Sequence, residues 1–153
     1  MYIKKEKFIS AFAEIEDVLT NYSLPSWDAL PDIDLYMDQV VSVVTKYLDV
    51  PRTAIGGTRS ITPAMINNYV KLGIIPPPKK KKYSKVHLAY LLIVFTLKQT
   101  LDMSTIQRII PADIDEETFR KNYDSFVSNQ HTAFNYVIAQ TRAVADPIFT
   151  LEG

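Results

Sequence analysis

The middle third of the chain combines many cations with no acid. From Val50 to Leu101 there is no aspartate or glutamate, and the same stretch holds nine cations: Arg52, Arg59, Lys71, Lys79, Lys80, Lys81, Lys82, Lys85 and Lys98. The flanks are acidic, with four cations against nine acids in residues 1–49 and four against eight in residues 102–153, so the chain is formally neutral. Such segregation predicts one cationic surface that meets a phosphate-rich partner.

Residue types inside this stretch fit contacts to a nucleic acid. Thr62 and the free N–H groups of a first helical turn can meet a phosphate oxygen. Asn67 and Asn68 each offer a donor and an acceptor, and asparagine can pair bidentately with adenine. Four consecutive lysines would release counterions from phosphates. The residues predicted to contact DNA are Arg59, Thr62, Asn67, Asn68, Tyr69, Lys71, Lys79, Lys80, Lys81, Lys82, Tyr83 and Lys85.

Several of these assignments have structural alternatives of equal weight. Tyr69 is amphipathic, and packing in the core accounts for it as well as a phosphate contact does. Asn67 and Asn68 are also ordinary residues for a solvated helix face. The lysine tract 79–82 by itself is equally compatible with a solvated loop that has no partner.

The periodicity of the first half predicts helices joined by proline-rich connections. Residues 5–21 form an amphipathic pattern, and residues 23–33 form a linker that Trp27 should pin to the core. Asp34 is expected to cap a helix over 35–48 that ends before Pro51, and residues 51–61 are expected to form a loop.

The second half predicts four more helices. Thr62-Pro63 starts a helix that stops at Gly73. A lysine-rich arm follows at 76–83, with at most a small hairpin around residues 74–84. Ser84 should cap a buried helix over 85–100, and Ser104 a short one ending before Pro111. Asp115 should start a long helix from 116 to 145, which Pro147 closes.

This order predicts a mainly α fold with a winged helix-turn-helix core, in which the 62–72 helix enters the major groove and the arm lies on the backbone. The expected organisation comprises an N-terminal helix in residues 1–22, a linker in 23–33, the DNA-binding core in 34–110 and a C-terminal helical segment in 111–153.

Three segments resemble the MerR regulators. Residues 65–76, Met-Ile-Asn-Asn-Tyr-Val-Lys-Leu-Gly-Ile-Ile-Pro, are similar to that family's second helix and wing start, and residues 81–84, Lys-Lys-Tyr-Ser, to its wing end. Residues 101–110 are similar to its Leu-Gly-Phe-Ser-Leu-x-x-Ile segment. More closely, residues 35–40, 65–71 and 82–84 resemble a bacterial MerR-like family catalogued only as a domain of unknown function. The resemblance covers about residues 27–110 and implies a DNA-binding transcriptional regulator.

Other classes of function find little support in the sequence. The chain has no cysteine, which excludes disulfides and thiolate metal sites. His87 and His131 are isolated, and no nucleophile–base motif is present, so we expect no enzyme activity, metal or cofactor. The longest apolar stretch, residues 86–97, is too short to span a bilayer. We expect a cytoplasmic protein that does not insert into membranes. The main alternative is a helical interaction module whose lysine arm binds an acidic partner or a membrane surface.

The C-terminal helix carries an apolar stripe that indicates an interface. Its members are Phe119, Tyr123, Phe126, Gln130, Phe134, Val137, Thr141 and Val144. The stripe could pack on this chain's own core, perhaps against the N-terminal helix. A homodimer through this helix is slightly favoured, because the MerR resemblance implies a C-terminal dimer helix and because a two-fold pair of small DNA-binding cores can read two half-sites.

Overall fold

The computed structural model describes residues 4–55, 60–110 and 113–150, all but 50–55 and 149 with their side chains. Six α-helices and one short 3-10 helix run through these residues, and no β-strand forms among them, so the mainly α class is confirmed. The elements are α1 (Lys5–Asn21), the 3-10 helix η1 (Trp27–Ala29), α2 (Met37–Ile55), α3 (Pro63–Lys71), α4 (Lys85–Leu97), α5 (Met103–Ile109) and α6 (Glu116–Phe149).

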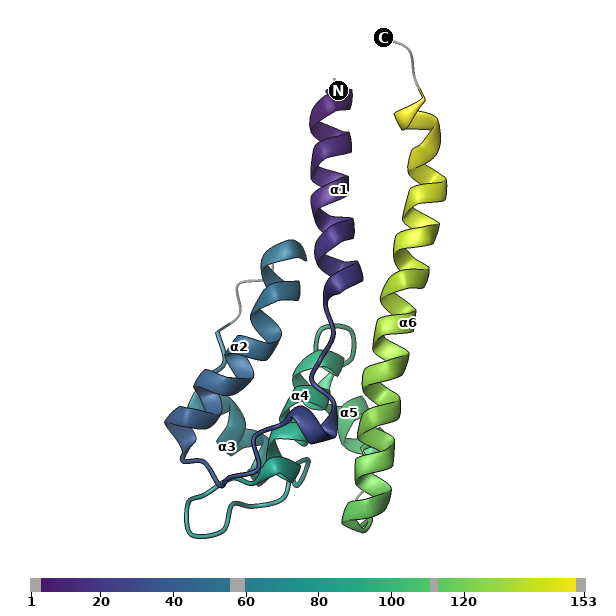
Figure 1. Cartoon of the computed structure of the whole chain (residues 1–153). Coiled ribbons are helices and arrows are strands. Elements are labelled where there is room, and N and C mark those ends of the chain that lie inside the picture. The colour runs from purple at the N-terminus through teal and green to yellow at the C-terminus, as the bar shows by residue number, and fades with distance from the viewer. Residues whose placement is uncertain (1–3, 56–59, 111–112, 151–153) are drawn as a thin grey trace.

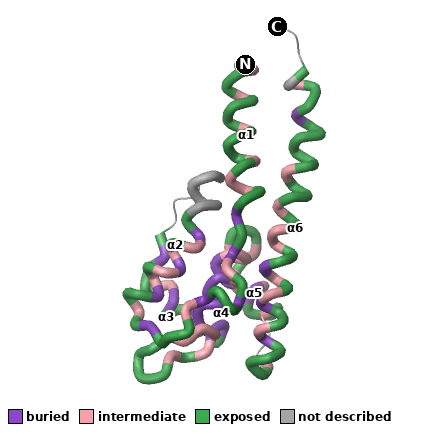
Figure 2. Tube along the Cα trace, in the orientation of Figure 1, coloured by how far each residue is buried: buried purple, intermediate pink, exposed green. Residues whose placement is uncertain are grey.

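The core is built around α4, which lies among the other helices in the lower half of the molecule (Figures 1 and 2). Most of α4 is buried, from His87 to Leu92 and again at Val94 and Phe95. This matches the nearly all-round apolar sequence of the helix, because a helix without a polar face must be enclosed. Within the described residues, no helix has the length and apolar character that crossing a bilayer requires.

The linker is clamped onto the start of α6. Trp27 is only 5% exposed and meets Phe119 and Tyr123 edge to face. The backbone N–H of Trp27 donates to the Asp124 carboxylate at 2.9 Å, and the Tyr123 hydroxyl donates to the carbonyl of Pro25 at 2.6 Å. The prediction that Trp27 pins the linker is confirmed.

Beyond the core, α1 and the distal half of α6 run side by side as a two-helix extension (Figure 1). Arg142 of α6 pairs with Glu16 and lies over the ring of Phe12. No described residue of α1 is buried, so α6 and α2, the helices that it contacts, cover it only in part. The extension therefore leaves apolar surface in contact with solvent.

The predicted boundaries of α2 are wrong at both ends. Leu35 is not helical, because its backbone N–H and C=O pair with those of Tyr83 at 2.8 Å. The helix starts instead after Tyr36, whose N–H donates to the side-chain oxygen of Gln39. At the other end α2 continues through Pro51 to Ile55, where a loop was expected.

The other predicted helix starts are mostly correct. Asp115 caps α6 by accepting the Thr118 N–H at 2.9 Å. The helix does not stop before Pro147 but includes it and ends at Phe149. The cap of α5 is Asp102 rather than Ser104, because the Asp102 carboxylate accepts the Thr105 N–H at 2.8 Å while Ser104 lies inside the first turn.

Candidate functional site

The sequence of α3 explains both of its ends. The Thr62 hydroxyl accepts the N–H of Met65 at 3.3 Å, and Pro63 occupies the first turn, where a missing N–H costs nothing. The helix ends at Lys71, and Gly73 follows with a φ of 72°, in the left-handed region that favours glycine after a helix end. Both signals were predicted, and both are confirmed.

The two faces of α3 differ in chemistry. Ile66 and Tyr69 face the core and are buried. Asn67, Asn68 and Lys71 are exposed, as the helical spacing places them on the other side. Exposed Ala64 precedes them on the same face, one turn earlier. The outer face of α3 thus carries side chains that are small, neutral or positively charged, with the amide groups of Asn67 and Asn68 at its centre.

Two residues that the sequence predicted to contact DNA are buried instead. Tyr69 is 1% exposed, packs edge to face on Phe95, and accepts a hydrogen bond from Lys98 Nζ at 3.0 Å. Tyr83 is 3% exposed, and its ring lies edge to face against His87. Both tyrosines are core residues and are not available to a ligand.

The lysine arm ends in a tight two-residue turn. Lys79 and Lys82 exchange backbone hydrogen bonds at 3.1 and 3.0 Å, and Lys80 and Lys81 between them have φ values of 53° and 63°. Positive φ at both central positions is the geometry of a type I′ turn, which glycine and asparagine prefer. Lysines at these positions cost roughly 1 kcal/mol or more each. No strands form beside the turn in the described part of the arm, so the β-sheet of a wing is not seen.

His87 ties the two ends of the arm to the core. Its Nδ1 accepts the N–H of Ser84 at 2.9 Å, so that nitrogen carries no proton. Its Nε2 lies 3.1 Å from the carbonyl of Pro77 and must carry the proton. Burial lowers the pKa of His87, more than the bonds to Pro77 and Pro76 raise it. A neutral imidazole thus bridges the residues on either side of the turn.

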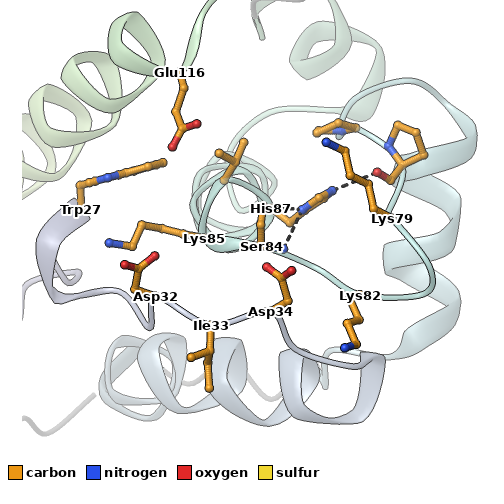
Figure 3. A pocket seen from close by; sticks show the side chains of 13 residues that line it. Trp27, Asp32, Ile33, Asp34, Lys79, Lys82, Ser84, Lys85, His87 and Glu116 are labelled. Carbon is orange, nitrogen blue, oxygen red and sulfur yellow. Dashed lines mark hydrogen bonds between the residues drawn. The ribbon is translucent and has the colours of Figure 1, made fainter.

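Beside the base of the arm is a hollow of about 820 Å³, shown in Figure 3. Its lysines come from the arm and from the start of α4, and its acids come from the segment before α2 and from the start of α6. The charged residues that line it are Asp32, Asp34, Lys79, Lys82, Lys85 and Glu116. The acids reduce the attraction of this side of the arm for phosphate. This mixture was not predicted, because the acids are remote from the lysines in sequence.

Six of the nine cations of the middle third form two groups, those that lie over an aromatic ring and those that do not. Lys82 lies over the ring of Tyr36, Lys85 over Trp27 and Lys98 over Tyr69, with ammonium-to-centroid distances of 5.3 to 5.5 Å. Lys85 is thus turned toward the hollow. Lys71 on α3 and Lys80 and Lys81 at the turn are exposed and have no such ring contact among the described residues. Arg59 lies outside the described residues.

Comparison with known families identifies the class of this domain. Residues 25–135 match the model of the family described as "Domain of unknown function (DUF1836)". The chain belongs to that family, whose match spans the linker, the core and the first half of α6. No curated protein and no solved structure matches the chain.

Proposed function

We propose that this protein is a sequence-specific DNA-binding transcriptional regulator. The observation that carries the proposal is the outer face of α3, where Asn67, Asn68 and Lys71 are exposed in a stretch of chain that has no acid. Exposed amides at the centre of a helix can read base edges, and a lysine beside them can hold a phosphate.

The order of the elements supports this proposal. A helix, a second short helix with an exposed polar face, a basic arm and a buried helix follow one another, which is the order in MerR-type winged helix-turn-helix proteins. The pairing of Leu35 with Tyr83 ties the segment before α2 to the end of the arm. In this proposal the tight turn at Lys80-Lys81 takes the place of a wing.

The charges restrict the phosphate contacts to part of the arm. Lys79 and Lys82 line the hollow together with Asp32 and Asp34, whereas Lys80 and Lys81 form the tip. The proposed interface therefore comprises Thr62, Asn67, Asn68, Lys71, Lys80 and Lys81. Tyr69, Tyr83 and Lys85 are no longer part of it.

The tip offers a test that separates charge from shape. The double change Lys80→Asn and Lys81→Gly removes two charges and installs the residues that a type I′ turn prefers, so the turn should persist. We expect binding to all duplexes to weaken, with the slope of log K against log salt reduced by about 1.8, or about 0.9 per lost phosphate contact. Fluorescence anisotropy over a salt series measures this slope.

Three comparisons make the test specific. Lys4→Gln with Lys7→Gln removes two exposed charges at the start of α1, one from the residue that precedes the helix, and should leave the slope almost unchanged. Asn67→Ala or Asn68→Ala should cost about 1–3 kcal/mol on a site selected from a random pool, and much less on random DNA. If the pool yields no preferred sequence, or if an acidic peptide or anionic vesicle binds more tightly than any duplex, the proposal fails in favour of an interaction module.

A further inference from the structure

The hollow beside the base of the arm is lined by charges of both signs. It has three lysines and three carboxylates: Lys79, Lys82, Lys85, Asp32, Asp34 and Glu116. None of these six side chains takes part in an ion pair with another described residue. Opposite charges therefore face one concavity without pairing with each other, which leaves both signs available to a bound molecule.

The backbone around the hollow is fixed by contacts that do not use these charged groups. Leu35 and Tyr83 exchange backbone hydrogen bonds at 2.8 Å, so Asp34, the residue before Leu35, is held beside the end of the arm. The ring of His87 lies 3.1 Å from the carbonyl of Pro77 and ties the start of the arm to α4. A wall that is already ordered lowers the entropy cost of binding a ligand.

The hollow also has the apolar surface that a small-molecule site needs. Trp27, Val86 and the prolines 76 and 77 line it together with the charged groups. Its volume of about 820 Å³ lies within the usual range of ligand sites, roughly 300–1,000 Å³. A few converging polar groups beside apolar walls are typical of a site that orients a small ligand.

The mixture of charges selects for a ligand that itself carries both signs. The three carboxylates would repel a purely anionic molecule, and the three lysines would repel a purely cationic one. A zwitterion brings an ammonium group to the acids and a carboxylate to the lysines, and it leaves the net charge of the site unchanged. Both groups form charge-assisted hydrogen bonds, which are the stronger kind.

We propose that the hollow binds a small zwitterion of the amino-acid class, a free amino acid or a short peptide. The ammonium group of the ligand is held by Asp34, and its carboxylate by Lys79. Lys82 and Lys85 already lie over aromatic rings, whereas Lys79 has no such contact among the described residues. Asp34 and Lys79 are both close enough to His87 to act on its charge, in opposite directions, so they share one part of the hollow (Figure 3).

The single tryptophan of the chain reports on this site directly. Trp27 lines the hollow, and a ligand that binds there alters its intrinsic fluorescence. Titration of each standard amino acid and of a set of dipeptides, at up to about 10 mM, detects a dissociation constant of about 1 mM or lower. We expect at least one compound to change the fluorescence saturably and, at about ten times its dissociation constant, to raise Tm by roughly 3 °C or more. If no compound does both, the proposal is overturned.

Derivatives of the ligand test the two charged contacts separately. The N-acetyl derivative lacks the ammonium charge and the carboxamide lacks the carboxylate, and each should bind about tenfold or more weakly than the parent ligand. Asp34→Asn should weaken the parent by a similar factor but leave the N-acetyl derivative unaffected, because the group that Asp34 holds is already gone. Lys79→Gln should act in the same way on the carboxamide. Derivatives that bind as tightly as the parent, or variants that weaken parent and derivative equally, overturn the proposal.

Matched variants elsewhere on the surface control for a general effect of charge. Asp146→Asn on α6 and Lys46→Gln on α2 remove exposed charges that do not line the hollow, and should leave the affinity unchanged. Asp34 and Lys79 are also exposed, so their variants should fold, which circular dichroism checks. Equal losses in the controls would mean that the ligand has no defined site. These measurements use the full chain without DNA, so their outcome does not depend on the proposed function.

Discussion

At the scale of single residues, His87 has a hydrogen-bond partner on each nitrogen of its ring. Both ring nitrogens are occupied, one as an acceptor from Ser84 and one as a donor to Pro77, so only the neutral ring satisfies both partners. Asp34 and Lys79 are the charged groups near it, and they act in opposite directions. The arm is thus held at its base by a side chain whose charge depends on pH.

Because His87 is held neutral in the folded protein, we expect the folded state to lose stability in weak acid. Because burial lowers the folded-state pKa of His87, the unfolded chain binds the extra proton first, at about pH 6.5. The stability that the neutral His87 ring contributes is fully present above that pH. It is lost as the pH falls toward the lower folded-state pKa. His87→Gln keeps a side chain that can cap Ser84 and should unfold with a flatter pH dependence between about pH 7 and 5.

Urea denaturation of the natural chain and of the variant, at half-unit steps of pH, measures the difference. His131 and the acids are common to both proteins and cancel in the comparison. The caps Asp102 and Asp115 have pKa values lowered by hydrogen bonds from Thr105 and Thr118, so their contributions are lost only in stronger acid. If the free energies of unfolding of the two proteins change in parallel with pH, His87 does not titrate in this range.

At the scale of elements, α2 shows why a proline did not end a helix. Pro51 has no N–H to donate to the carbonyl of Tyr47, four residues earlier. The hydroxyl of Tyr22, at the end of α1, donates to that carbonyl at 2.8 Å instead. A side chain remote in sequence therefore compensates for the missing backbone bond, and the helix continues to Ile55.

A double-mutant cycle tests this compensation. Tyr22→Phe leaves the Tyr47 carbonyl without its donor and should cost about 1–3 kcal/mol of unfolding free energy. In a Pro51→Ala background the backbone N–H of residue 51 can bond the carbonyl, so the same change should cost distinctly less. Chemical denaturation of the four proteins gives the coupling energy. Equal costs in both backgrounds would show that the hydroxyl does not substitute for the backbone bond.

At the scale of the whole molecule, the linker joins α4 to α6. Trp27 contacts α6 through Phe119 and Tyr123, and Lys85 of α4 lies over its ring. The family match starts at residue 25, so the clamp belongs to the part of the chain that the family model covers. These contacts hold the linker, the start of α4 and the start of α6 in one framework.

Loss of this clamp should affect global stability. Trp27→Ala is expected to cost about 3–5 kcal/mol, because a large buried ring is removed from a site bounded by other rings. Ile33→Ala, at a linker position that is 66% exposed, should change the stability by less than about 0.5 kcal/mol. Thermal unfolding followed by circular dichroism compares the two. A small loss at Trp27 would mean that the linker is not a structural part of the core.

The sequence by itself determined the features that depend on local chemistry. Thr62-Pro63 and Gly73 bound α3, Asp115 caps α6, and the apolar run of α4 is buried, because caps, breakers and periodicity act over a few residues. The acid-free middle third and the exposed amides of α3 could also be read directly from the sequence.

Only the tertiary structure decided the features that join remote segments. It assigned Tyr69 and Tyr83 to the core, placed Asp32 and Asp34 beside the lysine arm, and supplied the Tyr22 hydroxyl that lets α2 pass Pro51. It also showed that Phe119 and Tyr123 of the α6 stripe are buried in the core, whereas Val137 and Val144 are exposed. Burial and compensation depend on what packs opposite a residue, and spacing along one helix cannot show how much of its length the rest of the chain covers.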